Sequence, residues 1–176
     1  MNEKLKELII YIAQESKDDP NFVATKLNKI LFMADFFYYG TTGKSISEAE
    51  YWHLQNGPTP KAMKSVLDDL EANKEIEIIE RDHFGYSQKR VLPKRGANTS
   101  QFSRDEIEFV NQAIKSLWDK NGIELSNWTH TLIPWLITEN KSDIPYDSVF
   151  VLYQLPIERD GFLWAHRELD RLSITD

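Results

Sequence analysis

The chain has 176 residues, 41% hydrophobic and 12% aromatic, a composition typical of a globular protein with one core. The absence of cysteine excludes disulfides and thiolate chemistry, and a formal net charge of −7 opposes non-specific binding to nucleic acid. No apolar run approaches the roughly 18 residues of a membrane span, and the N-terminus lacks a signal-peptide pattern. We therefore predict a single cytoplasmic domain over residues 1–176, with no membrane partner.

Two helices are predicted at the start of the chain. Apolar residues at helical spacing predict the first over residues 2–16. The second is predicted over residues 20–39, with Asp19 as its N-cap and Pro20 in its first position. Its apolar residues lie on most faces, which is typical of a helix at the centre of a core. We expect Gly40 to end it in the left-handed conformation.

The next segments combine extended and helical patterns. Residues 51–58 indicate an extended piece followed by a turn. Thr59 is expected to cap a third helix that continues to about residue 73. Polar and apolar residues then alternate, which predicts strands over residues 75–80 and 86–92 joined in a hairpin.

The second half of the chain is predicted to be helical. Ser103 and Glu106 match a capping box at the start of a fourth helix, which Asn121 and the following glycine are expected to end. Ser126 is expected to cap a short helix that Pro134 ends.

Residues 144–153 form a further segment, and a last helix is predicted over residues 157–172. The sum is a mainly α fold of the α+β class: a compact domain of five to seven helices with one small antiparallel β-hairpin.

No catalytic, cofactor or metal motif is present. The histidines (His53, His83, His130 and His166) form no pair at i, i+3 or i+4, and there is no P-loop, dinucleotide fingerprint or nucleophile elbow. We therefore predict no catalytic residues, no cofactor and no metal. An enzyme that uses His130 with a carboxylate is the weakest of the hypotheses weighed.

A basic cluster on and after the second hairpin strand supports one alternative function. Two helices and a hairpin before it could form a winged-helix DNA-binding regulator, with Lys89, Arg90, Lys94 and Arg95 on the wing. The third helix, which would read the DNA, carries acidic residues that repel phosphate: Asp68, Asp69 and Glu71. We therefore expect no nucleic-acid partner.

Three segments, in order, resemble the SocA-like antitoxin family, also called the Panacea domain. Residues 26–35 resemble the family pattern K-L-x-K-L-L-Y-x-A-D. An aromatic pair followed by Gly-Pro forms the second segment, and L-S-x-x-S-H with a tryptophan five residues later forms the third, with Thr129 where the family prefers serine. The matching residues of the last two segments are Tyr51, Trp52, Gly57, Pro58, Ser126, His130 and Trp135.

The resemblance implies a mainly helical antitoxin that neutralises a co-encoded toxin by direct binding. It implies two routes, either blocking the toxin or delivering it to a cytoplasmic protease. Members of the family are encoded by bacteria and by phages, so a phage-associated protein of unknown role with the same domain is a further alternative. Because aromatic side chains anchor interfaces, we expect Trp52 and Trp135 near the partner.

Overall fold

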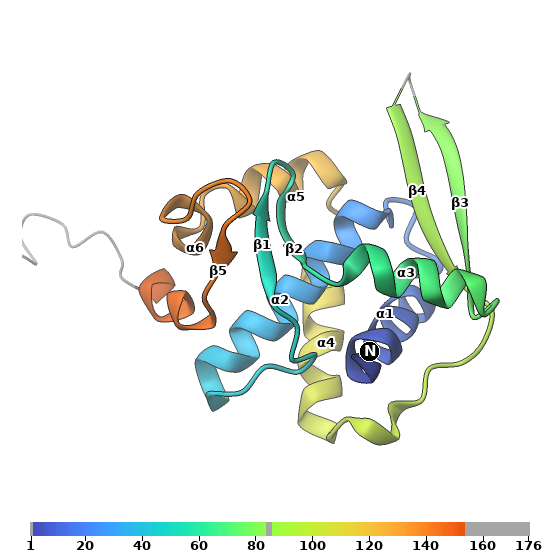
Figure 1. Ribbon diagram of the computed structural model, residues 1–176, viewed down its shortest axis with the longest axis horizontal. Coiled ribbons are helices and arrows are strands. Elements are labelled where there is room, and N and C mark those ends of the chain that lie inside the picture. The colour runs from blue at the N-terminus through green and yellow to red at the C-terminus, as the bar shows by residue number, and fades with distance from the viewer. Residues whose placement is uncertain (1, 84–85, 154–176) are drawn as a thin grey trace, which may run out of the picture.

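The computed structural model describes residues 2–83 and 86–153, and the helix predicted over residues 157–172 lies outside them. Figure 1 shows the arrangement. The helices are α1 (Glu3–Glu15), α2 (Ala24–Thr42), α3 (Met63–Ala72), α4 (Arg104–Leu117), α5 (Gly122–Thr129) and α6 (Ile133–Leu136), with 3-10 helices η1 (Thr99–Gln101) and η2 (Tyr146–Tyr153). The strands are β1 (Tyr51–Leu54), β2 (Gly57–Pro60), β3 (Ile76–His83), β4 (Tyr86–Pro93) and β5 (Asp143–Ile144). The mainly α class is confirmed.

The predicted hairpin is present as β3–β4, but the prediction of a single hairpin is wrong. A second, three-stranded antiparallel sheet has the order β2-β1-β5. Its strand β2 contains Pro58 and Pro60, which have no N–H to donate. The Lys61 N–H bonds Glu50 O, so alternate N–H groups face β1 and the prolines face the outer edge. This orientation lets a proline-rich segment act as an edge strand.

Helix α2 forms the centre of the core. Leu27, Ile30 and Leu31 are fully buried, and α2 packs against α1, α4, α5 and β2. The predicted start at residue 20 is wrong, because the Asp19 carboxylate accepts the Asn21 N–H in a separate turn and the helix begins at Ala24. The predicted end is also too early.

The end of α2 lies at Gly43 instead of Gly40. Gly43 has φ +71° in the left-handed region and its N–H bonds Tyr39 O, while Gly40 is a helical residue. Thr59 likewise does not cap a helix, because it lies in β2 and α3 begins four residues later.

Caps in the second half are partly as predicted. The capping box of Ser103 and Glu106 is confirmed. Asn121 ends no helix, because its side chain and Glu124 form the capping box that begins α5. Ser126 therefore lies inside α5, and Pro134 is in the first turn of α6.

Candidate functional site

The three segments of the motif meet at one buried side chain, Lys29 of α2. Its ammonium donates a hydrogen bond to the carbonyl oxygen of Asn56, in the turn between β1 and β2. The Ser126 hydroxyl on α5 donates to the same oxygen at 3.1 Å. We call Lys29, Asn56, Gly57, Ser126 and Thr129 the Lys29 junction. It joins α2, the β1–β2 turn and α5.

Gly57 is required at this junction by its backbone and its surroundings. Its φ of +99° lies in the region that favours glycine. A Cβ on Gly57 would overlap the Lys29 ammonium and lie 2.5 Å from Thr129 Oγ1. The Gly-Pro segment therefore lets the turn approach α2 and α5 closely.

Lys29 is an unusual charge for a protein core. The residue is 1% exposed, and no ion pair with it is formed within the described part of the chain. Burial lowers the pKa of the Lys29 ammonium to about 7. The cost of removing this charge from water therefore makes the junction sensitive to pH.

We expect Lys29 to make the protein more stable as the pH rises above about 7. The pKa of Lys29 is about 7 in the folded state and 10.5 when unperturbed. Between these values the unfolded chain holds a proton that the folded chain has lost. Stability therefore rises with pH by up to about 1.4 kcal/mol per unit. Urea melts from about pH 7 to about pH 8.5 should show a gain of about 2 kcal/mol that Lys29→Met lacks.

The Lys29→Met variant is the control for all other titrating groups, because it keeps a long apolar side chain at the position. Equal pH dependence in the two proteins would show that the ammonium is not desolvated as the structure indicates.

The second lysine of the motif, Lys26, is buried but compensated. Its ammonium pairs with the Asp19 carboxylate and donates to the carbonyl oxygens of Trp118 and Lys120, at 2.6 and 2.9 Å. Lys26 therefore connects α2 to the end of α4 and to the turn that precedes α2.

Asp35 fixes the middle of α2 to the segment that precedes β1. Its fully buried carboxylate accepts the N–H groups of Ile46 and Ser47, at 3.0 and 2.7 Å, and the hydroxyls of Ser47 and Tyr51. Burial raises the pKa of Asp35, although these hydrogen bonds oppose the shift. Tyr51 thus has a structural role beneath the sheet, where its ring contacts Phe32 and Phe36.

Trp135 joins the β1 strand to α6. Its ring stacks with the imidazoles of His53 and His130, each at a centroid distance of 4.1 Å. Its indole N–H points to Leu54 O at 3.5 Å. Burial, followed by the nearby His130, lowers the pKa of His53. His130 is half-buried, and its Nε2 has no hydrogen-bond partner among the described residues.

The predicted site residues therefore divide by exposure. Trp52 is 40% exposed. Tyr51, Gly57 and Pro58 are buried, and Ser126, His130 and Trp135 are half-buried. Sequence reasoning missed Lys29 and Asn56 as parts of the site. The available signal was a pair of lysines, Lys26 and Lys29, on a helix that has apolar residues on most faces.

Comparison with sequence families identifies the family of this chain. The family described as antitoxin SocA-like, Panacea domain, matches residues 27–136. The chain belongs to the SocA-like antitoxin family. The match includes Lys29, the β1–β2 turn and Trp135, so the Lys29 junction lies inside the Panacea domain. Searches of curated proteins and of solved structures found no match.

The basic cluster of this Panacea domain is largely engaged within the protein. Arg95 pairs with Glu7 and Glu75, and Lys94 pairs with Glu77. The Arg90 guanidinium donates to the backbone oxygen of residue 17 at 2.6 Å. Figure 1 shows the β3–β4 ribbon extending from the helical body as a wing would. Three side chains of the basic cluster are nevertheless held by these contacts within the protein.

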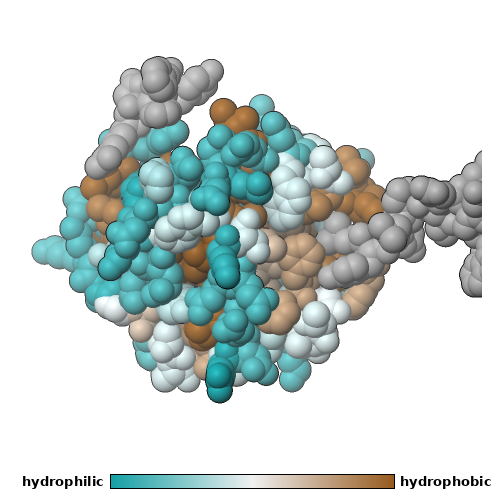
Figure 2. Space-filling model, turned by 180° about the vertical axis from the view of Figure 1, so that it is seen from behind, coloured by the Kyte–Doolittle hydropathy of each residue, from teal (hydrophilic) through white to brown (hydrophobic). Residues whose placement is uncertain are grey.

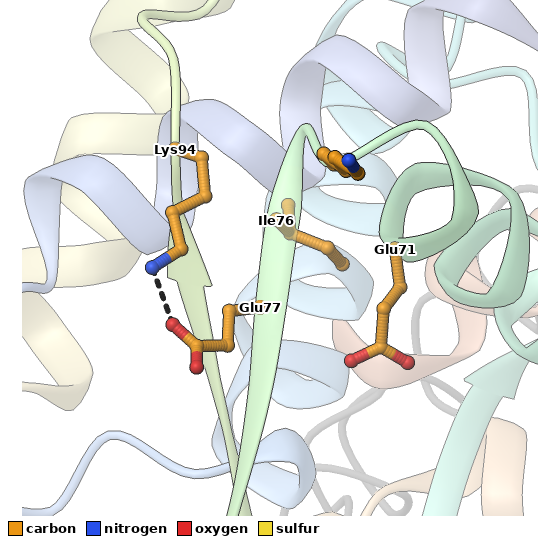
Figure 3. Close-up of a pocket in the computed structure, with 5 residues that line it drawn as sticks. Glu71, Ile76, Glu77 and Lys94 are labelled. Atoms are coloured by element: carbon orange, nitrogen blue, oxygen red, sulfur yellow. Dashed lines mark ion pairs between the residues drawn. The ribbon is translucent and has the colours of Figure 1, made fainter.

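A hollow of about 400 Å³ beside β3 is a weaker candidate site. Its lining includes Glu71, Lys74, Glu77 and Lys94, so acidic and basic groups balance. In Figure 3, Glu77 and Lys94 point toward one another, and the Glu71 carboxylate also accepts the Ile78 N–H at 3.0 Å. Glu71, Glu77 and Lys94 are already partnered, and the two acidic and two basic side chains of the lining leave no excess charge for a ligand.

Neither a metal-ligand cluster nor a membrane-spanning helix occurs in the described ranges. In residues 2–83 and 86–153, no group of three or more His, Cys, Asp or Glu side chains could hold a metal ion. None of the helices described there has the length and apolar character that crossing a bilayer requires.

Proposed function

We propose that this protein is the antitoxin of a toxin–antitoxin pair, and that it neutralises a co-encoded toxin by direct binding without turnover. The observation that carries the proposal is the match to the SocA-like antitoxin family over residues 27–136. The interior position of most motif residues supports it, because they form a scaffold and leave the surface free for a partner.

Exposed apolar side chains near the end of the described chain suggest where the toxin binds. Leu136 and Ile137, at the end of α6, are 60% and 62% exposed, and Phe150 of η2 is 52% exposed. Helices α6 and η2 pack against each other, and Figure 2 shows apolar surface on this side of the molecule. We call Leu136, Ile137 and Phe150 the α6–η2 patch. Exposed apolar patches of this kind are typical of protein interaction sites.

Trp52 is a further exposed aromatic side chain, on the β2-β1-β5 sheet. It lies in β1 opposite Asp143 of β5, the strand that links α6 to η2. Its neighbours Tyr51 and His53 face inward and are buried, whereas Trp52 is exposed. A partly exposed tryptophan is a suitable anchor for an interface.

We expect Trp52→Ala to weaken the toxin complex by about 2 kcal/mol, which is about a 30-fold rise in Kd. The measurement is titration calorimetry with the protein encoded beside this chain. The melting temperature should change little, because Trp52 contributes little to the core.

Trp135→Ala and Ile123→Ser are the matched variants for this experiment. Trp135→Ala removes a stacked, half-buried ring, so it should lower the melting temperature. Ile123→Ser removes an apolar side chain of α5 that is 75% exposed, more than Trp52, and should leave binding unchanged. Wild-type affinity in Trp52→Ala would remove this residue from the interface.

Two finer statements remain predictions of the family resemblance. One is that the complex is delivered to a cytoplasmic protease, and the other is that the gene belongs to a prophage. A DNA-binding regulator is the second candidate function. The engagement of Lys94 and Arg95 by glutamates disfavours it, because these side chains would have to leave their partners to reach phosphates.

A further inference from the structure

A polar groove lies where the start of α2, the β1–β2 turn and the loop after α6 come together. Its volume is about 430 Å³, within the roughly 300–1,000 Å³ of ordinary binding pockets. Four carboxamide side chains line it: Asn28, Gln55, Asn56 and Asn140. The only charged lining residue in the described chain is Lys141. We call this feature the amide groove.

One buried polar atom of the amide groove lacks a hydrogen-bond partner among the described residues. The buried Oδ1 of Asn28 has no hydrogen-bond partner within the described residues. Because the oxygen and nitrogen of an amide can exchange places, this position can present either an acceptor or a donor. A buried polar atom without a partner costs free energy that a ligand could recover.

The charge of the groove is opposite to that of the protein. The chain carries −7 overall, yet no acidic residue lines the groove. Lys141 forms no ion pair with any described residue. The first turn of α2 borders the groove without an acidic side chain or a side-chain cap, which adds to the positive character. These features complement a ligand with a carboxylate.

We infer that the amide groove binds an extended polypeptide segment that carries a carboxylate next to Lys141. The carboxamides can pair with the N–H and C=O groups of an extended backbone, which has unpaired groups of both kinds. Lys141 supplies the counter-charge for an aspartate, a glutamate or a chain terminus.

This inference deepens the proposed function. It rests on the proposed function for one point, that the bound polypeptide segment belongs to the toxin. Asn140 follows Ile137 by three residues, so the groove lies within about 11 Å along the chain from the α6–η2 patch. A toxin whose apolar side chains contact the α6–η2 patch could place an acidic segment in the amide groove at the same time.

The test is an NMR titration of the full chain with a probe peptide. The probe is the N-acetylated, C-amidated peptide Ala-Ser-Ala-Glu-Ala-Ser-Ala, and its counterpart has Gln in place of Glu. We expect the Glu peptide to shift the side-chain carboxamide signals of Asn28, Gln55, Asn56 and Asn140. The Gln peptide should bind about fivefold more weakly, because it lacks the charge that pairs with Lys141.

Two lysine variants decide whether the charge acts locally. Lys141→Gln should weaken binding of the Glu peptide by the same factor of about five, whereas Lys64→Gln should not. Lys64 is an exposed lysine of α3 that does not line the groove, and its replacement by Gln changes the net charge by the same amount. Absence of groove shifts, or equal effects of the two variants, would overturn the inference.

The titration can be separated from the test of the proposed function, because it does not use the co-encoded protein. Groove binding of the Glu peptide without any toxin complex would refute the proposed function alone. A toxin complex that is unaffected by Lys141→Gln, together with no groove shifts, would refute the groove alone.

Discussion

Replacing Asp35 by alanine is expected to lower the free energy of unfolding by about 5 kcal/mol. The carboxylate accepts four hydrogen bonds in a fully buried position, two from backbone N–H groups and two from hydroxyls. Alanine would leave those donors buried without an acceptor. Since each unsatisfied buried donor costs about 1–3 kcal/mol, the sum exceeds the cost of any single lost contact.

Asp35→Asn provides the comparison that separates hydrogen bonding from volume. Its carbonyl oxygen can still accept the two backbone N–H groups, and the hydroxyls of Ser47 and Tyr51 can turn to accept its amide. We expect Asn to cost about half as much as Ala in a urea melt. Equal costs for the two variants, or a loss below about 1 kcal/mol for Ala, would contradict the structural role of Asp35.

Gly57→Ala is expected to cost about 4 kcal/mol of stability. Its φ of +99° would strain any other residue, and the new Cβ would overlap Lys29 and Thr129. Both clashing groups are buried parts of the Lys29 junction, so relief requires the β1–β2 turn to move away from α2 and α5. A urea melt measures the loss, and the exposure of Trp135 to a fluorescence quencher should rise with that movement.

Gly43→Ala is the matched control for backbone strain. Gly43 also has a positive φ, +71°, but a Cβ there would meet nothing within 4 Å. We expect it to lose only about 1 kcal/mol, the cost of the left-handed conformation alone. If the two glycine variants lose the same amount, close approach at the Lys29 junction is not what requires Gly57.

Positions where local patterns determine structure were predicted correctly from the sequence. The alternation after residue 75 gave the β3–β4 hairpin, and the spacing of Ser103 and Glu106 gave the start of α4. Asn121 and Glu124 match the same capping pattern, so the start of α5 was also readable. The Asn121-Gly122 pair also matches the pattern of a helix end, because helix starts and helix ends both favour asparagine and glycine.

The second sheet could not be predicted from local pattern. Strand β2 has the sequence Gly57-Pro58-Thr59-Pro60, and two prolines in four residues argue against a strand. The segment pairs because its register places the backbone nitrogens of both prolines on the edge of the sheet away from β1. That register depends on β1. Similarly, Asp19 matches the sequence pattern of a helix cap, and nothing nearby in sequence reveals its pairing with Lys26.

The partner-binding role of the motif residues stays a prediction. The three motif segments meet at the Lys29 junction, and most of their residues lie in the interior of the domain, an arrangement that the sequence did not predict. Lys29 holds α2 to the β1–β2 turn, and Asp35, about two turns further along the helix, holds it to the segment before β1. The exposed residues Leu136, Ile137 and Phe150 carry no motif signal. We infer that most of the motif specifies the scaffold, and that Trp52 together with exposed residues outside the motif contacts the partner.

A growth assay tests the central proposal most directly. The gene beside this one is expressed in a bacterial host, alone and together with this chain. We predict that the neighbour arrests growth alone, that this chain restores growth, and that the Leu136→Ser/Ile137→Ser double variant restores it poorly while remaining folded in a thermal melt. A harmless neighbour, or a neighbour that stays toxic in the presence of the folded wild-type chain, would contradict the antitoxin proposal.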